Sequence, residues 1–241
     1  MKAFTLLPAL PLFFTPVIAN TEKAIFLGPP AVNIPQSRPT ISDLRLPTLT
    51  PLARNTTSLR TKLTPVFPSP QYPDGSSTWL LLDDLTPGQR YEVRVCWAAT
   101  QPTTFHLTPY PLETVFDSPD LITSLNAYSS TRQPSEPSLL PPSAALLPPN
   151  EVQKSLLFLH ILAAADFYSS DSSLMKKPPP VDVDIILDPF LLNVLPKSLL
   201  PTVCYILVVA LAAIFVSGKI VRLLKGLIAS SLETSDEKKT Q

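Results

Sequence analysis

The chain has 241 residues with 19 basic and 19 acidic side chains, so its formal net charge is zero. This balance argues against nucleic-acid binding, which needs a basic face. The chain contains 30 prolines and only 5 glycines. Dinucleotide-binding folds and phosphate-binding loops need glycine for close backbone approach, so both are disfavoured. With 2 Cys and 2 His, a four-ligand structural zinc site would use every such residue.

The N-terminus has the pattern of a secretory signal peptide. Lys2 supplies a positive start, the apolar run Leu6–Phe14 follows, and Val17-Ile18-Ala19 offers a cleavage site. The alternative is an uncleaved anchor, which the short run and the two prolines within it disfavour. We therefore expect residues 1–19 to be a signal peptide that is cleaved after Ala19.

The next segment begins with an expected strand at Glu22–Leu27, which Gly28-Pro29-Pro30 ends. Residues 29–73 are proline-rich and could add one further strand at Ile41–Leu46. Within them, Asn55-Thr56-Thr57 is an N-glycosylation acceptor. The alternative for Asn55 is a sequon that stays unmodified.

The clearest structural signal lies in residues 72–109, where turn residues separate three expected strands. The strands are Thr78–Leu82, Arg90–Trp97 and Thr103–Leu107. The second alternates strictly between apolar and polar side chains, as expected of a strand with one face in a core.

The phrase around Tyr91 resembles the tyrosine corner of a fibronectin type III domain. It consists of Leu85, Pro87, Gly88 and Tyr91 at fixed spacing, and in that family the tyrosine hydroxyl bonds back to the upstream turn. The resemblance implies that Tyr91 takes this role, that Pro87 and Gly88 fix the turn, and that Leu85 fills the core. It favours a fibronectin type III or immunoglobulin-like β-sandwich and says nothing about function.

Residues 110–150 form a Pro/Ser-rich stretch that we expect to be a long loop or a poorly ordered insert. Ser155–Ala165 suits a short helix or a buried strand, and its alternation favours a strand. Val181–Ile185 alternates cleanly as a strand, which Asp188-Pro189 should end. The apolar Phe190–Leu195 should then lie on a bilayer surface. About seven strands result, enough for one sandwich.

Leu199–Gly218 is a run of 20 residues without a charged side chain. As a helix it covers about 30 Å, the thickness of one hydrocarbon core. Three basic residues, Lys219, Arg222 and Lys225, follow the run directly, which places the C-terminal side in the cytosol. The sequence therefore predicts a type I single-pass protein with luminal residues 20–198, a span at 199–218 and a cytosolic tail at 219–241. Ala213 and Ser217 form a small-xxx-small pair that could pack on another membrane helix.

The last four residues place Lys238 and Lys239 at the fourth and third positions from the end. This resembles the dilysine signal by which a retrieval coat returns type I proteins to the endoplasmic reticulum. The alternative is a solvated charged tail, because acidic residues lie beside the pair. We expect localisation in the endoplasmic-reticulum membrane.

The sequence offers few residues for catalysis. His106 lies in an expected strand and His160 in an apolar run, so each is better explained as a structural histidine than as a general base. Asp83-Asp84 and Asp182-x-Asp184 have spacings found in metal-dependent glycosyltransferases. The second pair follows from strand alternation alone, however, and such an enzyme needs a nucleotide-binding domain that this chain has no room for. We predict no catalytic, cofactor-binding or metal-binding residue.

Three stretches resemble a fungal family of co-activators of GPI mannosyltransferase II. They are Asn20–Leu27, Tyr91–Trp97, and Asp184–Phe190 leading to Leu195–Thr202. The resemblance implies a non-catalytic subunit of the endoplasmic-reticulum membrane. Its partner would be a multi-spanning mannosyltransferase that adds the second mannose to the GPI precursor from dolichol-phosphate mannose. The family offers no catalytic residues to carry over.

Three hypotheses on function remain at this point. The first is an accessory subunit that stabilises or activates the mannosyltransferase through luminal and intramembrane contacts, and the alternative is a cargo receptor or chaperone for secretory clients. A long-lived complex with one enzyme would distinguish the first from the second. The third is a small luminal hydrolase, which would need activity that is lost on changing Asp182 or Asp184.

Overall fold

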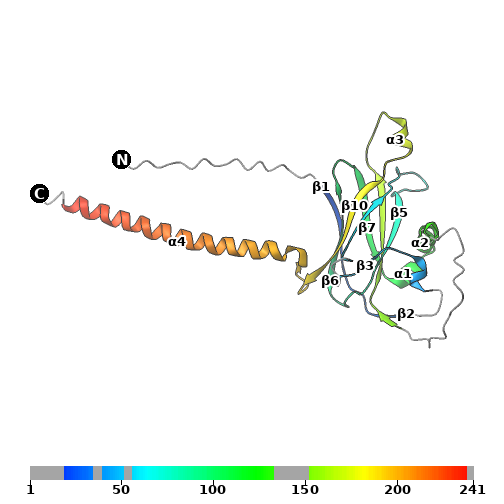
Figure 1. Ribbon diagram of the computed structural model, residues 1–241, viewed down its shortest axis with the longest axis horizontal. Helices are drawn as coiled ribbons and strands as arrows, with labels where there is room; N and C mark the ends of the chain where they lie inside the picture. Colours follow the sequence, from blue (N-terminus) through cyan, green and yellow to red (C-terminus); the bar gives the residue numbers. More distant parts are fainter. Residues whose placement is uncertain (1–18, 35–39, 52–55, 133–151, 238–241) are drawn as a thin grey trace. The chain divides into compact units, whose positions relative to one another are not determined.

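The computed structural model describes residues 19–34, 40–51, 56–132 and 152–237 (Figure 1). The chain divides into two compact units, Met1–Asp188 and Pro189–Gln241, which we call the β-rich unit and the C-terminal unit. Three predicted features lie outside the described residues: signal-peptide residues 1–18, the glycosylation site Asn55, and the dilysine pair Lys238 and Lys239.

The first sheet of the β-rich unit is antiparallel where its register is defined. Its strands lie in the order β1, β6, β10, with β4 on the other side of β10. Their bounds are β1 (Ala19–Leu27), β6 (Arg90–Ala98), β10 (Val181–Leu191) and β4 (Ser58–Leu63). In this register Lys23 lies opposite Arg94, and Asp184 lies opposite Arg60, so the polar side chains of neighbouring strands meet on one face.

The second sheet has the order β3-β5-β9-β7, with β9 antiparallel to both β5 and β7. Its strands are β3 (Thr48–Leu49), β5 (Ser76–Leu82), β9 (Leu157–Ala165) and β7 (Thr103–Tyr110). A separate two-stranded ladder pairs β2 (Val32–Ile34) with β8 (Val152–Lys154).

The two sheets enclose one hydrophobic core, because alternate side chains of each strand point inward. From β6 the core takes Tyr91, Val93 and Val95, each fully buried. From β9 it takes Leu159 and Ile161, which are also fully buried. The β-rich unit is therefore a two-sheet sandwich, and the chain is mainly β with one long apolar helix near its C-terminus.

Two helices cover the outer face of the second sheet, on the side away from β1 and β6 (Figure 1). They are α1 (Leu112–Asp117) and α2 (Pro119–Thr131). Val115 and Leu125 pack with Trp79 and Phe158 in a second buried cluster. Strands β5 and β9 are thus buried on both faces, which explains their nearly continuous apolar sequences.

The prediction of a loop from residue 110 is wrong for residues 112–131, which are helical. The prolines there start helices instead of preventing them. Pro111 occupies the N-cap of α1, and Pro119 stands at the first position of α2, where a helix needs no backbone N–H. Residues 133–150 of the expected insert lie outside the described part of the chain.

Two further elements differ from the sequence-based predictions. Ile41–Leu44 is a 3₁₀ helix (η1) that Thr40 and Asp43 cap, not a strand. Strand β10 also continues through Asp188-Pro189 to Leu191. Proline is tolerated there because the ladder to β4 ends at Ile186, so the missing N–H at position 189 breaks none of its bonds.

The other expected strands are confirmed, because each overlaps an observed strand. The specific fibronectin or immunoglobulin-like strand order is not confirmed. In immunoglobulin-like sandwiches the strand with the tyrosine corner and the next strand share a sheet. Here β6 and β7 lie in different sheets. The likeness to that family is limited to the corner and the two-sheet architecture.

The C-terminal unit consists of the end of β10, the short strand β11 (Leu195–Pro196), the 3₁₀ helix η2 (Lys197–Leu199) and helix α4 (Leu200–Glu237). The stretch Lys197–Gly226 is long and apolar enough to cross a membrane, and no part of its most apolar window is buried. It contains the predicted span, Leu199–Gly218.

Candidate functional site

The turn between β5 and β6 is built around Tyr91. Its hydroxyl accepts a hydrogen bond from the backbone N–H of Thr86 at 2.9 Å and donates one to Gln89 Oε1 at 3.0 Å. Gly88 adopts a φ of 75°, which the turn accepts at little cost because glycine lacks a side chain. Leu85 is buried in the core, one residue before Thr86. The structure thus brings the four predicted residues Leu85, Pro87, Gly88 and Tyr91 together in one corner.

Gly28, predicted only to end the first strand, completes this corner. Its N–H donates to the Gln89 carbonyl at 2.8 Å, and its carbonyl accepts from Gly88 N–H at 2.9 Å. A Cβ on Gly28 would lie 2.2 Å from the Thr86 carbonyl oxygen. No other residue fits such an approach, so the end of β1 is joined to the corner through glycine.

The acidic pair on β10 is neutralised by basic residues of β4. Arg60 donates to Asp184 through Nε at 2.7 Å and Nη2 at 2.9 Å, and Lys62 Nζ lies 2.8 Å from Asp182 Oδ1. The hydrogen bond from Arg60, with its positive charge, holds the pKa of Asp184 below its usual value. A carboxylate that a guanidinium binds at two points would have to release that guanidinium before it could bind a metal ion.

The acidic pair Asp83-Asp84 is also engaged by a basic side chain. Lys154 Nζ donates to Asp83 Oδ2 at 2.6 Å and lies 4.0 Å from Asp84 Oδ1. The hydrogen bond to Asp83 is the main cause that raises the pKa of Lys154. Asp84 itself has a φ of 55°, as expected of aspartate in a turn. This pair therefore ties the β5–β6 turn to β8.

A third acidic site was not anticipated from the sequence. Glu92 is 5% exposed, and its carboxylate lies 3.4 Å from Lys23 Nζ and 3.3 Å from Arg94 Nη1. Alternation along β6 indicated only that Glu92 faces away from the core. Its burial depends on neighbouring strands, which the sequence does not specify.

The basic partners Arg60 and Lys62 were missed because β4 was not predicted. The segment Ser58–Leu63 does carry the alternation typical of a strand. Leu59, Thr61 and Leu63 alternate with the polar residues Ser58, Arg60 and Lys62. The proline-rich surroundings of this segment concealed a period-2 pattern that is short but regular.

His160 has the contacts of a structural histidine and one contact that resembles a catalytic pair. Its ring stacks on Trp79 with centroids 4.2 Å apart, and its Nε2 lies 2.9 Å from Ser77 Oγ. Burial lowers the pKa of His160 to about 4, so the ring is neutral at physiological pH. Catalysis would also need a group that orients the ring, and no carboxylate contact to His160 occurs among the described residues. His106, by contrast, is exposed on β7.

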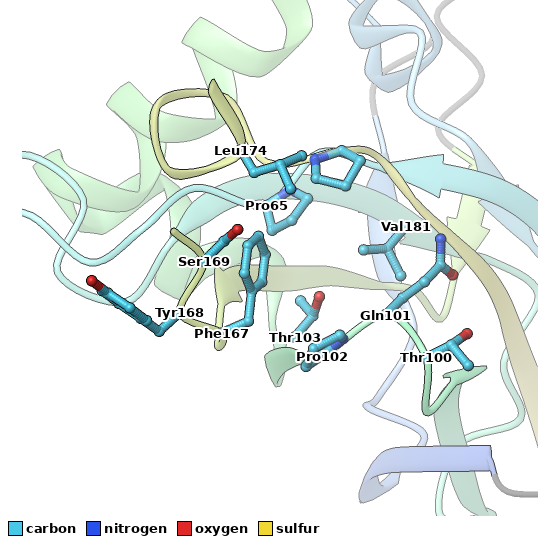
Figure 2. Close-up of a pocket in the computed structure, with 11 residues that line it drawn as sticks. Pro65, Thr100, Gln101, Pro102, Thr103, Phe167, Tyr168, Ser169, Leu174 and Val181 are labelled. Atoms are coloured by element: carbon cyan, nitrogen blue, oxygen red, sulfur yellow. The ribbon is translucent and has the colours of Figure 1, made fainter. Parts of the chain in front are cut away.

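A pocket of about 340 Å³ opens at one end of the sandwich (Figure 2). Phe167 and Leu174 lie on one side of it, and Gln101 and Val181 on the other. The Tyr168 ring points away from the other labelled side chains and is 89% exposed. Among the described residues that line it, none is Asp, Glu, Lys, Arg or His.

The described residues contain no group of three or more His, Cys, Asp or Glu that could hold a metal ion. Both cysteines are free. Cys96 is half-buried on the outer face of β6, where Thr21 Oγ1 lies 3.6 Å from its sulfur, and Cys204 is exposed on α4.

Helix α4 carries the predicted packing residues Ala213 and Ser217, which are both exposed. Four residues on an α-helix bring both side chains to nearly the same face. The helix surface around them is apolar, with exposed Val209, Val216 and Ile220 three or four positions away.

The chain is similar to a known protein family. The model of the Pga1 family, described as GPI-Mannosyltransferase II co-activator, matches residues 10–220. The chain belongs to this family. The match includes most of the β-rich unit and most of the apolar stretch of α4, so the resemblance predicted from three short stretches is confirmed over most of the chain.

One relative of this chain is a protein of Schizosaccharomyces pombe named as a GPI mannosyltransferase 2 subunit. The two are 40% identical over 68 residues, which cover 27% of this chain and 38% of the relative. The alignment therefore spans well under half of either protein. No solved structure matches the chain.

Proposed function

We propose that the chain is a non-catalytic accessory subunit that activates the endoplasmic-reticulum mannosyltransferase adding the second mannose to the GPI precursor. The observation that carries this proposal is the co-activator family match over residues 10–220. The relative named as a GPI mannosyltransferase 2 subunit supports the same complex. The partner would be the multi-spanning catalytic subunit, and the chain itself would need no cofactor.

The arrangement of acidic groups supports an accessory role. The two pairs considered for metal-dependent chemistry each engage basic side chains: Asp184 and Asp182 bind Arg60 and Lys62, and Asp83 binds Lys154. Their carboxylates serve to join strands and turns. In this proposal the β-rich unit presents a stable surface to the enzyme, and the chemistry takes place on the catalytic subunit.

The proposed topology is type I in the endoplasmic-reticulum membrane. Residues 1–19 are the cleaved signal, residues 20–198 are luminal, 199–218 form the span, and 219–241 are cytosolic. Strand β1 begins at Ala19, so cleavage there leaves Asn20–Leu27 paired with β6. Asn55 carries a glycan, and a retrieval coat reads Lys238 and Lys239.

Affinity capture of the full-length chain tests this proposal. A tag inserted directly after residue 19 leaves the C-terminal tail free, and the complex is isolated in mild detergent. We expect one mannosyltransferase in stoichiometric amount. Recovery of many secretory clients without that enzyme would overturn the proposal and favour the alternative of a cargo receptor or chaperone.

A further inference from the structure

The turn that connects β10 to β11 exposes an unusual set of apolar side chains. Leu191 is 37% exposed, Leu192 is 96% exposed and Val194 is 78% exposed. The turn is well formed, because Val194 N–H donates to the Leu191 carbonyl at 3.0 Å and Leu191 pairs with Leu195. A hairpin in water would normally place polar residues at such a tip.

The backbone conformation makes this choice of residues more informative. Leu192 has a φ of 51° and Asn193 a φ of 59°, so both central residues are in the left-handed region, which favours Asn, Asp or Gly. Asn193 suits this conformation, whereas Leu192 does not. Chain reversal alone therefore does not account for a leucine at this position.

The turn lies close in the chain to the start of the long apolar helix α4. It lies within the C-terminal unit and is followed by β11, by η2 at Lys197–Leu199 and directly by α4 at Leu200. A strand rises about 3.3 Å and a 3₁₀ helix about 2 Å per residue, so β11 and η2 separate the turn from the start of α4 by at most roughly 13 Å. The headgroup layer on each side of a bilayer is about 5 to 8 Å thick. If α4 enters the hydrocarbon near Leu199, this turn lies within or close to the headgroup layer on that side.

We propose that the turn Leu191–Val194 is an interfacial anchor that inserts Leu192 and Val194 into the headgroup layer of the membrane that α4 enters. The exposed Lys197 two residues after Leu195 would lie at the level of the lipid phosphates. Two attachment points fix the tilt of the segment before the span, which a single helix leaves free. This inference depends on α4 spanning a membrane and not on the identity of the enzyme partner.

Fluorescence of a Leu192→Trp variant tests the anchor in the full-length protein, reconstituted alone into phosphatidylcholine vesicles. The native Trp79 and Trp97 are 0% and 9% exposed and provide a constant background. Because the Leu192 side chain is almost fully exposed, the substitution removes no packing. The matched control is Tyr168→Trp, which introduces the same indole at an exposed position of the β-rich unit.

We expect lipids brominated near the headgroup end of the acyl chain to quench most of the emission added at position 192, and aqueous iodide to leave it largely unchanged. The control should show the opposite pattern. Iodide quenching of Leu192→Trp to the level of Tyr168→Trp, without quenching by brominated lipid, would overturn the anchor. Shielding that arises only when the catalytic subunit is added would overturn it as well, because the turn would then bind protein.

Discussion

Tyr91 and Thr86 are joined by a hydrogen bond of 2.9 Å from the Thr86 backbone N–H to the Tyr91 hydroxyl. This bond closes the β5–β6 turn over a tyrosine that is fully buried in the core. The Phe26 ring stacks on Tyr91 with centroids 5.7 Å apart, and Gly28 bonds to the same turn. One residue therefore links the sandwich core, the turn and the first strand.

Replacing Tyr91 with Phe keeps the packed ring but removes the acceptor of the Thr86 N–H. A part-buried donor left without a partner costs about 1 to 3 kcal/mol, so we expect the free energy of unfolding of the full-length protein to fall by that amount. Chemical unfolding in mild detergent measures the loss. Tyr168→Phe, at an exposed tyrosine, is the control and should have no effect; equal stability of both variants would contradict the role assigned to the hydroxyl.

His160 should make stability depend on pH. Its pKa is about 4 in the folded chain and 6.5 when unperturbed, so between these values the unfolded chain binds more protons than the folded one. Stability therefore falls as the pH drops from about 6.5 towards 4, by up to about 3 kcal/mol from this group alone.

The His160→Gln variant separates this contribution from other titrating groups. The variant lacks the ring stack at every pH. Between pH 7 and pH 4.5, a range that spans most of the titration, its free energy of unfolding should fall less than that of the wild type. His106→Gln, at an exposed histidine, is the comparison. An identical decline in wild type and His160→Gln would show that His160 is not the responsible group.

The ion pair between Arg60 and Asp184 should also lose its stabilising effect in acid, but at a lower pH than the His160 contribution. Arg60 lowers the pKa of Asp184 from its ordinary 3.8, so the pair stabilises the fold fully above this value and loses its effect as the pH falls through the lowered pKa. Asp184→Asn should slightly reduce the melting temperature at neutral pH and much less in strong acid. Asp74→Asn, in an exposed turn, is the comparison. A deficit that persisted unchanged in acid would mean that the pair is not its source.

The expected packing of α4 on another membrane helix can be tested at Ala213 and Ser217. Replacing both with Leu fills the small-residue face of α4, so we expect less catalytic subunit to co-purify, while the melting behaviour of the β-rich unit stays unchanged. Ala212→Leu is the matched control, because at about 100° per residue it lies on another helix face. Full recovery of the enzyme with the double variant would assign the contact to a different surface.

Strand alternation made much of the sandwich predictable. The alternation from Arg90 to Trp97 correctly predicted which side chains of this strand face the core, and the motif from Leu85 to Tyr91 predicted the corner. Both depend only on residues close in sequence. The helices at 112–131 were missed because proline content was taken as evidence against helix, although Pro119 stands where helices accept it.

The charged contacts could not be derived in the same way. Arg60 and Asp184 are separated by 124 positions in the chain, and their pairing follows from the register of β4 on β10. The burial of Glu92 likewise depends on which strands flank β6. Sequence patterns identify which side chains leave the core, whereas the tertiary arrangement decides which of them meet.

The most direct test of the co-activator function is mannose transfer by membranes that contain the catalytic subunit, measured with and without this chain. The acceptor is a GPI precursor with one mannose, and the level of the catalytic subunit is determined in the same membranes. We expect addition of the second mannose to require the chain, and restoring the full-length chain to restore transfer. Transfer at the normal rate in its absence, at an equal level of the catalytic subunit, would contradict the account.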